Sequence, residues 1–300
     1  MNKLIYLLIL ILISASAFSC QTEKSNDNDL GLVALAVIAN GSAVTSIPFE
    51  LVSGTDAFSC NQAISGSGST QLQLRDARFF VHDVKLVKAD GSTTDFILST
   101  DDTWQNGTVA LLDFENRTGQ CTVGTTDTNK TLRGYAAPGL YVGVEFKVGV
   151  PTAQNKLLNT TGGAPLNTTG MYWSWTTGYK FMKFEWRALE GAGSTNQFHT
   201  GGVSCTGGNG NDITCAYPNI PTVRITRSNN AIWSATENPI YINIQELVKN
   251  TNSNLSNGGA SYTCMAGNTT ASCKSILNSI GINETDGKTL STQSAFSIKN

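Results

Sequence analysis

The stretch from Leu140 to Val150, Leu-Tyr-Val-Gly-Val-Glu-Phe-Lys-Val-Gly-Val, decides the fold. Apolar side chains occupy every second position from Leu140 onward, and Tyr141, Gly143, Glu145 and Lys147 fill the positions between them. A period of two places alternate side chains on opposite faces of an extended chain. The stretch therefore predicts an antiparallel strand with one buried and one solvated face.

The same alternation recurs along the chain, whereas helical periodicity is restricted to Gln245 to Asn250 and Lys274 to Ile280. Asp90-Gly91 and Asn40-Gly41 are hairpin signals. Short strands separated by turns predict an all-β fold, an antiparallel β-sandwich with Greek-key-like connections and few short helices, as one domain over residues 30–300. The further predicted strands are Leu32 to Ala39, Pro48 to Val52, Phe79 to Lys88, Phe96 to Ser99, Val109 to Phe114, Lys180 to Ala188, Thr222 to Arg227 and Ile240 to Ile244.

The composition excludes several classes of protein. The 300 residues carry 20 Lys and Arg against 22 Asp and Glu, a formal net charge of -2, and only 14% of them are charged. This balance provides neither the basic footprint of a nucleic-acid-binding protein nor a basic membrane-surface patch. So few charges also exclude helical bundles and coiled coils. With two histidines, mechanisms that need several imidazoles are excluded as well.

The first residues have the architecture of an export signal. Lys3 precedes an apolar run from Leu4 to Ile13, and small residues follow it. The run ends in Ala17-Phe18-Ser19-Cys20, which resembles a bacterial lipobox. We predict a signal peptide over residues 1–19, lipidation of Cys20 with a disordered tether over residues 20–29, and anchoring to the bacterial outer membrane on its periplasmic side or at the cell surface. The alternative is an ordinary signal cleaved nearby.

The seven cysteines are an odd number for an exported protein. Assigning Cys20 to the lipid leaves six, which formally allow 15 connectivities. We predict pairing in sequence order, because the last two pairs then close short loops rich in Gly and Asn. A thiol metal site is the alternative, but no Cys-x-x-Cys spacing exists and an exported protein meets an oxidising environment. The predicted disulfides are Cys60 with Cys121, Cys205 with Cys215, and Cys264 with Cys273.

The candidate site residues are the two histidines and a Trp-x-Trp pair. Alternation places His82 on the apolar face of its strand, together with Phe80, Val84 and Leu86, and His199 lies where a strand runs into a flexible loop. Two imidazoles that converge in the core would suit copper, because a soft, low-coordinate ion needs few ligands. Taken separately, each histidine is of a kind that is more often structural than a metal ligand. The alternatives for Trp173 and Trp175 are packing in the core or a platform for a sugar ring.

Several blocks, in order, resemble the copper-binding proteins related to MbnP, the periplasmic partner encoded beside methanobactin biosynthesis genes. The likeness extends over roughly residues 31 to 282 and rests on the order and spacing of the blocks. They are Pro48 to Val52, Asp76 to Val84, Trp104-Gln105, Ala110 to Glu115, Gly149 to Pro151, Pro165 to Asn167, Trp173 to Phe181, Phe198-His199, Cys215 with Pro218-Asn219, and Cys264-Met265 to Cys273.

The resemblance implies a copper-binding protein that has no turnover of its own and acts in copper uptake or homeostasis. In the family, histidines and a kynurenine made from a tryptophan of the Trp-x-Trp motif hold Cu(I), and a di-haem peroxidase of the MauG type oxidises the tryptophan. Carried over, this implies His82 and His199 as metal ligands and Trp173 or Trp175 as the modified residue. Where many relatives have an Asn-His pair, this chain has Asn155 and Lys156.

Each ligand imidazole needs a carboxylate or carbonyl on its other nitrogen. Alternation turns Asp83 away from His82, so we look to Asp76, Asp113 or a neighbouring strand. Two other functions stay open at this point. One is a metal-free binding or adhesion lipoprotein on the same sandwich, and the other is a redox enzyme that uses the copper.

Overall fold

A computed structural model describes residues 42–65, 71–174, 176–188, 195–208, 211–249, 262–265 and 271–300. The predicted signal peptide, Cys20, the tether, the strand from Leu32 to Ala39, the Asn40-Gly41 turn and Trp175 lie outside these residues. None of the helices that the structure describes has the length and hydropathy needed to cross a membrane.

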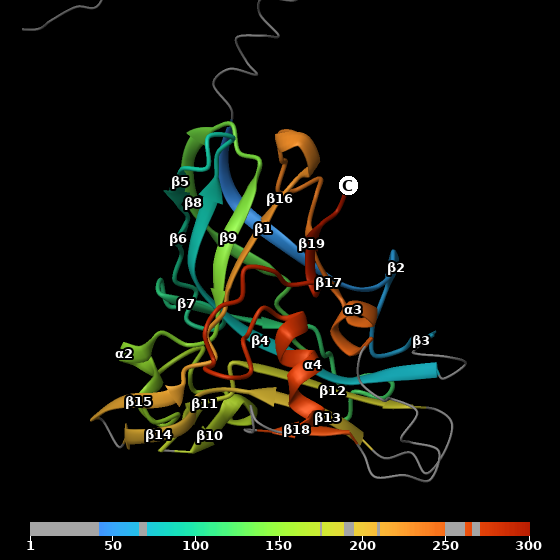
Figure 1. Cartoon of the computed structure of the whole chain (residues 1–300), viewed down its shortest axis with the longest axis vertical. Helices are drawn as coiled ribbons and strands as arrows, with labels where there is room; N and C mark the ends of the chain where they lie inside the picture. The colour runs from blue at the N-terminus through green and yellow to red at the C-terminus, as the bar shows by residue number, and fades with distance from the viewer. Residues whose placement is uncertain are drawn as a thin grey trace, which may run out of the picture. The chain divides into compact units, whose positions relative to one another are not determined.

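The described residues form two main sheets, which confirms the predicted all-β sandwich (Figure 1). One sheet has six strands in the order β19 (Phe296–Ile298), β17 (Ile240–Asn243), β1 (Ser42–Ser53), β8 (Thr131–Gly139) and β6 (Ile97–Leu98), with β2 (Asp56–Ala57) paired to β1. Pairing is antiparallel except between β1 and β17, which run parallel.

The other sheet has nine strands and carries the candidate site. Its order is β16 (Thr222–Thr226), β9 (Gly143–Val148), β4 (Gln71–Val87), β12 (Met182–Ala188), β13 (Thr195–Thr200) and β18 (Thr263–Met265), and β3 (Ala63–Ser65), β5 (Thr93–Asp95) and β7 (Val109–Asp113) also pair with β4. Here β13 and β18 form the parallel pair. Two small hairpins, β10 (Tyr172–Ser174) with β11 (Gly178–Tyr179) and β14 (Val203–Gly208) with β15 (Asn211–Tyr217), complete the strands.

Helical segments are short. They are α2 (Thr152–Asn155), α3 (Ile244–Val248), α4 (Ala271–Ser279) and the 3-10 turns η1 (Thr169–Met171) and η2 (Ser228–Asn230). The predicted helices near residues 245 and 274 are therefore confirmed with shifted ends. The Asp90-Gly91 hairpin is also confirmed, since it joins β4 to β5, but only Gly91 has a positive φ there.

The predicted alternation is confirmed within β9, whereas at the ends of the predicted stretch Leu140 is exposed, Tyr141 is buried, and Val150 lies in a separate apolar cluster. Val144, Phe146 and Val148 are fully buried in the main core, whereas Glu145 and Lys147 are partly exposed. Phe146 meets Phe49 and Phe296 of the facing sheet edge to face, with ring centroids 5.6 and 5.5 Å apart. These contacts between strands distant in sequence join the two layers of the sandwich.

Strand β4 is covered on both faces. Ala77, Phe79 and Val81 point into the main core, whereas Phe80 belongs to a second apolar cluster. The chain between β9 and β12 supplies most of that second cluster: Val150, Leu166, Met171, Tyr179 and Phe181, with Val109 and Leu111 from β7. The face of β4 that carries Arg78, Phe80 and His82 is therefore buried beneath this segment, whereas Leu72 and Leu74 lie in the main core because the β4–β12 register shifts between Leu74 and Asp76.

A bulge at Asp83 corrects the predicted environment of His82. Asp83 has a φ of 49°, and the β4–β9 register shifts between His82 and Lys85. An extra residue in one strand reverses the alternation beyond it. Phe80 and His82 therefore share the second face, as predicted, but Val84 and Leu86 lie in the main core on the opposite face. The Asp83 carboxylate pairs with Lys147 and Lys85, at 2.8 and 3.2 Å.

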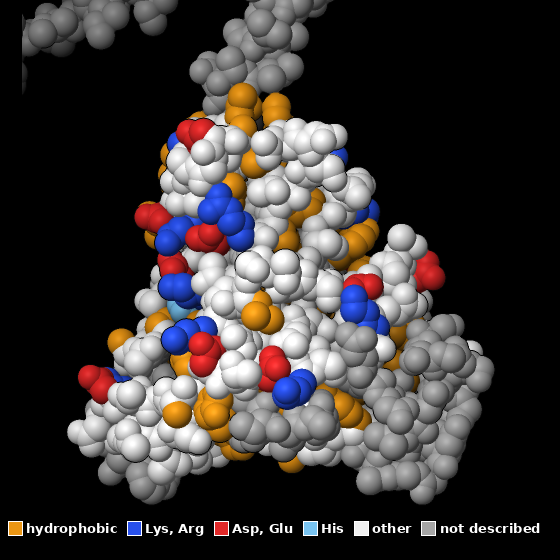
Figure 2. Space-filling view, in the orientation of Figure 1, with side chains coloured by type: hydrophobic (Ala, Val, Ile, Leu, Met, Phe, Trp, Pro, Cys, Tyr) orange, Lys and Arg blue, Asp and Glu red, His pale blue; other side chains and the backbone are white. Residues whose placement is uncertain are grey.

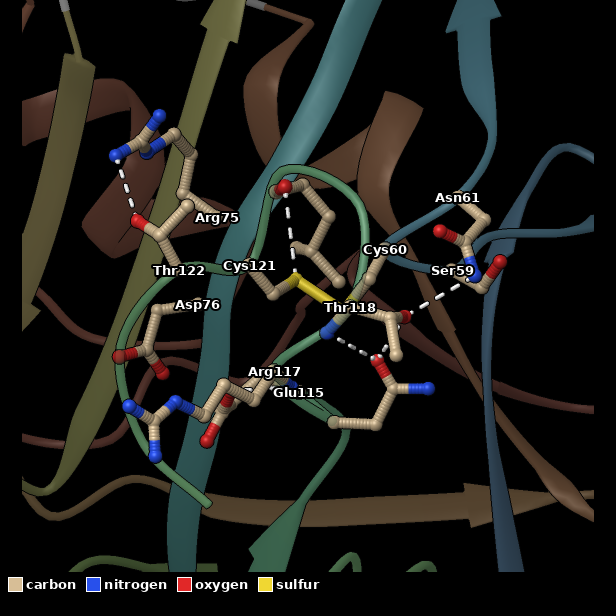
Figure 3. Close-up of a disulfide and its surroundings, with 12 residues drawn as sticks. Ser59, Cys60, Asn61, Arg75, Asp76, Glu115, Arg117, Thr118, Cys121 and Thr122 are labelled. Carbon is tan, nitrogen blue, oxygen red and sulfur yellow. Dashed lines mark hydrogen bonds between the residues drawn. A yellow bond between two sulfur atoms is a disulfide. The ribbon is translucent and has the colours of Figure 1, made fainter. Parts of the chain in front are cut away.

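Three disulfides join the cysteines in sequence order, as predicted. The bond between Cys60 and Cys121 ties the loops that follow β2 and β7 against β4, which contributes Arg75 and Asp76 to the same view (Figure 3). The other two bonds close short segments, with sequence separations of 10 and 9. On the face drawn in Figure 2, basic and acidic side chains lie close to one another rather than in a patch of one sign.

Candidate metal centre

His199 on β13 has one ring nitrogen bound and the other free. The side chain is buried, and its Nε2 lies 2.8 Å from Oε1 of Glu185 on β12. Burial alone would raise the pKa of Glu185, but the hydrogen bond from His199 and the charge of Lys183 outweigh it and lower the pKa to about 2. The carboxylate is therefore ionised and accepts, so Nε2 donates. The buried Nδ1 has no hydrogen-bond partner in the described structure.

Trp173 on β10 lies against this imidazole. The two rings meet edge to face, with centroids 6.4 Å apart and an interplanar angle of 84°. Strand β10 is held by Lys180, whose Nζ donates to the carbonyls of Gly170 and Tyr172 at 3.0 and 3.4 Å. An unpartnered imidazole nitrogen thus lies beside the half-buried indole that the sequence singled out.

Gly201 gives Trp173 its position, because a Cβ at residue 201 would lie 3.2 Å from the indole Cε3 and only 2.7 Å from the Tyr179 carbonyl oxygen. The Gly201→Ala variant must shift the backbone or the indole. We expect a loss of about 1–3 kcal/mol in the free energy of unfolding, typical of overpacking, and a changed tryptophan near-UV signal. Gly163→Ala is the control, since open space surrounds that position, although its φ of +66° adds strain. An unchanged near-UV spectrum in Gly201→Ala would contradict this placement.

The face of the sheet that carries His199 also carries a buried ionic network. Asp76 pairs with Arg78 on its own strand and with Nζ of Lys183 on β12 at 2.6 Å. Lys183 also reaches Oε1 of Glu185 at 3.3 Å, and Glu185 holds His199. The network therefore runs across three strands and ends at the imidazole, which fixes the orientation of the ring.

His82 lies in a different environment. It is buried, and its Nδ1 donates to the Gly149 carbonyl at 2.8 Å. Burial lowers the pKa of His82 to about 4, the Gly149 hydrogen bond opposes this, and Lys147 lowers the pKa further. The ring is therefore neutral at pH 7, with Nε2 as its lone-pair nitrogen.

The low pKa of His82 predicts acid sensitivity. In the unfolded chain the imidazole protonates near pH 6.5, but in the folded protein only near pH 4, so stability is lost as the pH falls from 6.5 to 4. The shift corresponds to about 3 kcal/mol. Urea unfolding at several pH values between 4 and 6.5 measures the free energy of unfolding of the wild type and of His82→Asn. The Asn amide can donate to the Gly149 carbonyl but does not titrate. Parallel pH profiles for the two proteins would refute the prediction.

The structure corrects the expectation that the two imidazoles converge. His199 pairs with Lys183 and Lys183 with Arg78, which lies four residues before His82 on β4. The histidines share a face, but two strand spacings and four residues separate them, roughly 16 Å between Cα atoms, and Phe80 lies between Arg78 and His82. Metal–nitrogen bonds are about 2 Å long, so this arrangement does not let the two rings share one ion.

The hydrogen-bond partners of the two imidazoles differ from those predicted, except that one partner does come from a neighbouring strand. Neither Asp76 nor Asp113 binds a histidine; a backbone carbonyl and a carboxylate on a neighbouring strand do so instead. Sequence reasoning missed Glu185, although the signal was present, since Lys183 and Glu185 alternate with the buried Phe184 and Trp186. Within the described ranges, no three His, Cys, Asp or Glu side chains are grouped to hold a metal.

The segment after β9 positions the Trp-x-Trp loop. The Asn155 amide donates to the Thr177 carbonyl at 3.3 Å, and its oxygen accepts from the Tyr179 backbone N–H at 3.0 Å. Lys156, the next residue, pairs with Asp212 at 2.7 Å. Asn155 is thus a structural support, and Lys156 supplies no lone pair for a metal.

Comparison with known proteins agrees with the sequence blocks. The family model MbnP matches residues 42–266. Among solved structures, MbnP from Methylosinus trichosporium superimposes with a TM-score of 0.73 at 26% sequence identity, and the match covers 86% of this chain and 99% of that one. A search of curated proteins finds no match.

Proposed function

This chain belongs to the MbnP family, and from that premise we propose that it is an exported copper-binding protein with no turnover of its own, acting in copper uptake or homeostasis. The observation that carries the proposal is the unpartnered Nδ1 of His199, buried beside Trp173. A buried nitrogen without a partner is destabilising, and a metal ion would satisfy it. The Glu185 carboxylate on Nε2 is the outer support that ligand imidazoles in metal sites have.

The residues fit Cu(I) better than other ions. Zinc prefers four ligands, and calcium and magnesium prefer oxygen cages. A site with one imidazole and few carboxylates suits a soft, low-coordinate metal. His82 is the other candidate imidazole, but its separation from His199 leaves it outside this centre. We therefore assign His199 as the imidazole ligand and keep His82 as a buried structural histidine.

We assign Trp173 as the tryptophan that becomes kynurenine, because its ring meets His199. Two molecules of hydrogen peroxide would each deliver one oxygen atom, to indole C2 and C3, as the C2–C3 bond breaks and two waters are released. Hydrolysis of the resulting N-formyl group then releases C2 as formate, which leaves an aryl amine and a ketone. These groups have the lone pairs that an indole lacks. The oxidation requires a partner enzyme, and we propose a di-haem peroxidase of the MauG type for this role. Lipidated Cys20 would hold the protein on the outer membrane, at its periplasmic side or the cell surface.

The test uses protein purified from its native cells. Mass spectrometry of the peptide that contains both Trp173 and Trp175 should show one kynurenine, with fragment ions placing it at 173. Copper should copurify with the wild type and be lost in Trp173→Phe and in His199→Gln, whose amide keeps the donor to Glu185. Trp104→Phe, which alters a half-buried indole of the second cluster, is the control and should keep its copper.

The outcomes separate the alternative functions. Two intact indoles and no copper in native protein would overturn the proposal and favour a metal-free binding or adhesion lipoprotein. Kynurenine at residue 175 would show that Trp175, and not Trp173, is the modified residue. Retention of copper by His199→Gln would show that His199 is not a ligand. Oxygen-dependent turnover of an added substrate that needs the copper would make the protein a redox enzyme instead.

A further inference from the structure

We propose that the end of the sandwich where β1 begins is a membrane contact, and that acyl chains of the surrounding phospholipids enter a groove between Leu140 and Ile232 there. The inference goes beyond copper binding, because it assigns a second surface with a different ligand. It rests on one part of the proposed function, the lipid on Cys20, and its test separates the two.

The groove lies between the start of β1, the turn that joins β8 to β9, and the segment that follows η2. It has a volume of about 270 Å³. The structure describes no charged side chain in its lining, which consists of Ala43 to Ser46, Gly139 to Tyr141 and Ile232 to Thr236. Pockets for drug-sized molecules have about 300–1,000 Å³. This smaller, uncharged groove therefore suits the end of a hydrocarbon chain.

The two aromatic residues of the groove have partners for their polar groups inside the protein. Tyr141 and Trp233 are buried, and the Tyr141 hydroxyl donates to the Ala137 carbonyl at 2.7 Å. The indole N–H of Trp233 donates to the Asn238 carbonyl at 2.7 Å, and its backbone N–H donates to the Tyr141 carbonyl. What these residues offer to a ligand is therefore hydrocarbon.

The rim of the groove exposes large apolar side chains to solvent. Leu140 is 38% exposed and Ile232 is 50% exposed. Hydrophobic side chains also gather at this end in the space-filling view, at the upper edge of the described surface (Figure 2). A single exposed apolar residue is ordinary, but several around an uncharged groove mark an interaction site.

The course of the chain favours lipid over another protein as the occupant. Ser42 begins β1 at this end, and Ala43 lines the groove. Cys20, which carries the lipid under the proposed function, precedes Ser42 by only 22 positions. A short covalent tether keeps the local concentration of lipid high at the end that it enters. Because β10 and β13 lie toward the opposite end (Figure 1), such a contact leaves Trp173 and His199 facing away from the membrane.

The experiment uses the lipoprotein purified from native membranes and reconstituted in phospholipid vesicles that carry a nitroxide on the acyl chain. An environment-sensitive fluorophore is attached at Ile232→Cys. The matched control is Ala153→Cys, an exposed position on α2 toward the opposite end. Emission at residue 232 should shift to the blue and be quenched several-fold more strongly than emission at residue 153. The quenching should persist at high salt, because salt screens ionic contacts and not apolar ones.

A second variant shows whether the groove itself makes the contact. In the Leu140→Glu background a carboxylate opposes entry into hydrocarbon, so quenching at residue 232 should fall to the level at residue 153. Leu140→Met keeps the side chain apolar and should keep the quenching. Circular dichroism of each variant checks folding.

Several outcomes would overturn the inference. Equal quenching at residues 232 and 153 would remove the contact. A blue-shifted probe before vesicles are added would mean that other residues of the chain cover the groove, or a second copy if dilution of the protein reverses the shift. A blue shift that appears with lipid but without nitroxide quenching would assign the groove to the acyl chains of the anchor itself.

The result is separable from the proposed function. The mass of the amino-terminal peptide decides whether Cys20 carries a lipid, and the copper content reports on the metal centre; neither measurement uses the probe. Copper that is lost in Trp173→Phe, with no quenching at residue 232, would support the proposed function alone. Quenching at residue 232 in a protein that holds no copper would support the membrane contact alone.

Discussion

Replacement of Asp76 by Asn should destabilise the protein by about 3–5 kcal/mol, the range typical when one partner of a buried ion pair is removed. Asp76 is fully buried and pairs with two cations, Arg78 and Lys183. Burial alone would lower the pKa of Arg78, but Asp76 raises it above its ordinary value. The variant therefore leaves the cations of Arg78 and Lys183 buried without the carboxylate that pairs with both of them.

Urea unfolding of wild type and variant at pH 7 measures this effect. Asp90→Asn is the matched control, because Asp90 is exposed in the β4–β5 turn and surface substitutions change stability little. In the double variant Asp76→Asn/Lys183→Met, one unpaired cation is removed with the carboxylate, so the loss should be smaller than the sum of the single losses. Strict additivity would show that the two side chains are not coupled.

Removal of the Cys60–Cys121 disulfide in the double variant Cys60→Ala/Cys121→Ala should cost about 4 kcal/mol. The bond closes a segment with a sequence separation of 61, and the entropy that a cross-link removes from the unfolded chain grows with the logarithm of that length. Both cysteines are also buried, so the smaller alanines leave a void that adds to the loss.

The Cys205–Cys215 bond is the comparison, since its separation is 10. The same dependence on segment length gives about 3 kcal/mol for the removal of this disulfide. The β14–β15 hairpin that contains it contributes no residue to the main core cluster. Unfolding in urea at equal protein concentration compares both double variants with the wild type. A larger loss from the 205–215 variant would contradict the argument from chain length and burial.

Local pattern was sufficient for much of the fold. Strict alternation in Leu140 to Val150 predicted β9, and cysteine order predicted all three disulfides, because each depends on residues close in sequence or on simple pairing. The parallel pairs β1–β17 and β13–β18 could not be predicted, since strand direction depends on which distant segments meet. The bulge at Asp83 was also hidden, because nothing in Val81-His82-Asp83-Val84 marks an added residue.

The candidate site was predicted in its parts but not in its arrangement. His199 and Trp173 were singled out from the sequence and lie in contact. The expected meeting of His82 with His199 fails because strand order, a property of the whole sheet, places β12 between their strands. The partner role of Glu185 escaped notice for the same reason, because it depends on the neighbouring strand that brings His199 to the carboxylate.

The central position of β4 has a consequence for the order of folding. Its partners β3, β5 and β7 come from nearby sequence, but β12 begins at Met182, long after β4 ends at Val87. Pairing over such distances must first overcome a large loop-closure entropy, which slows it. During synthesis, the part of β4 that holds Asp76 and Arg78 therefore waits for the later strands, and the hydrogen bond between Glu185 and His199 can form only after β12 and β13 have joined.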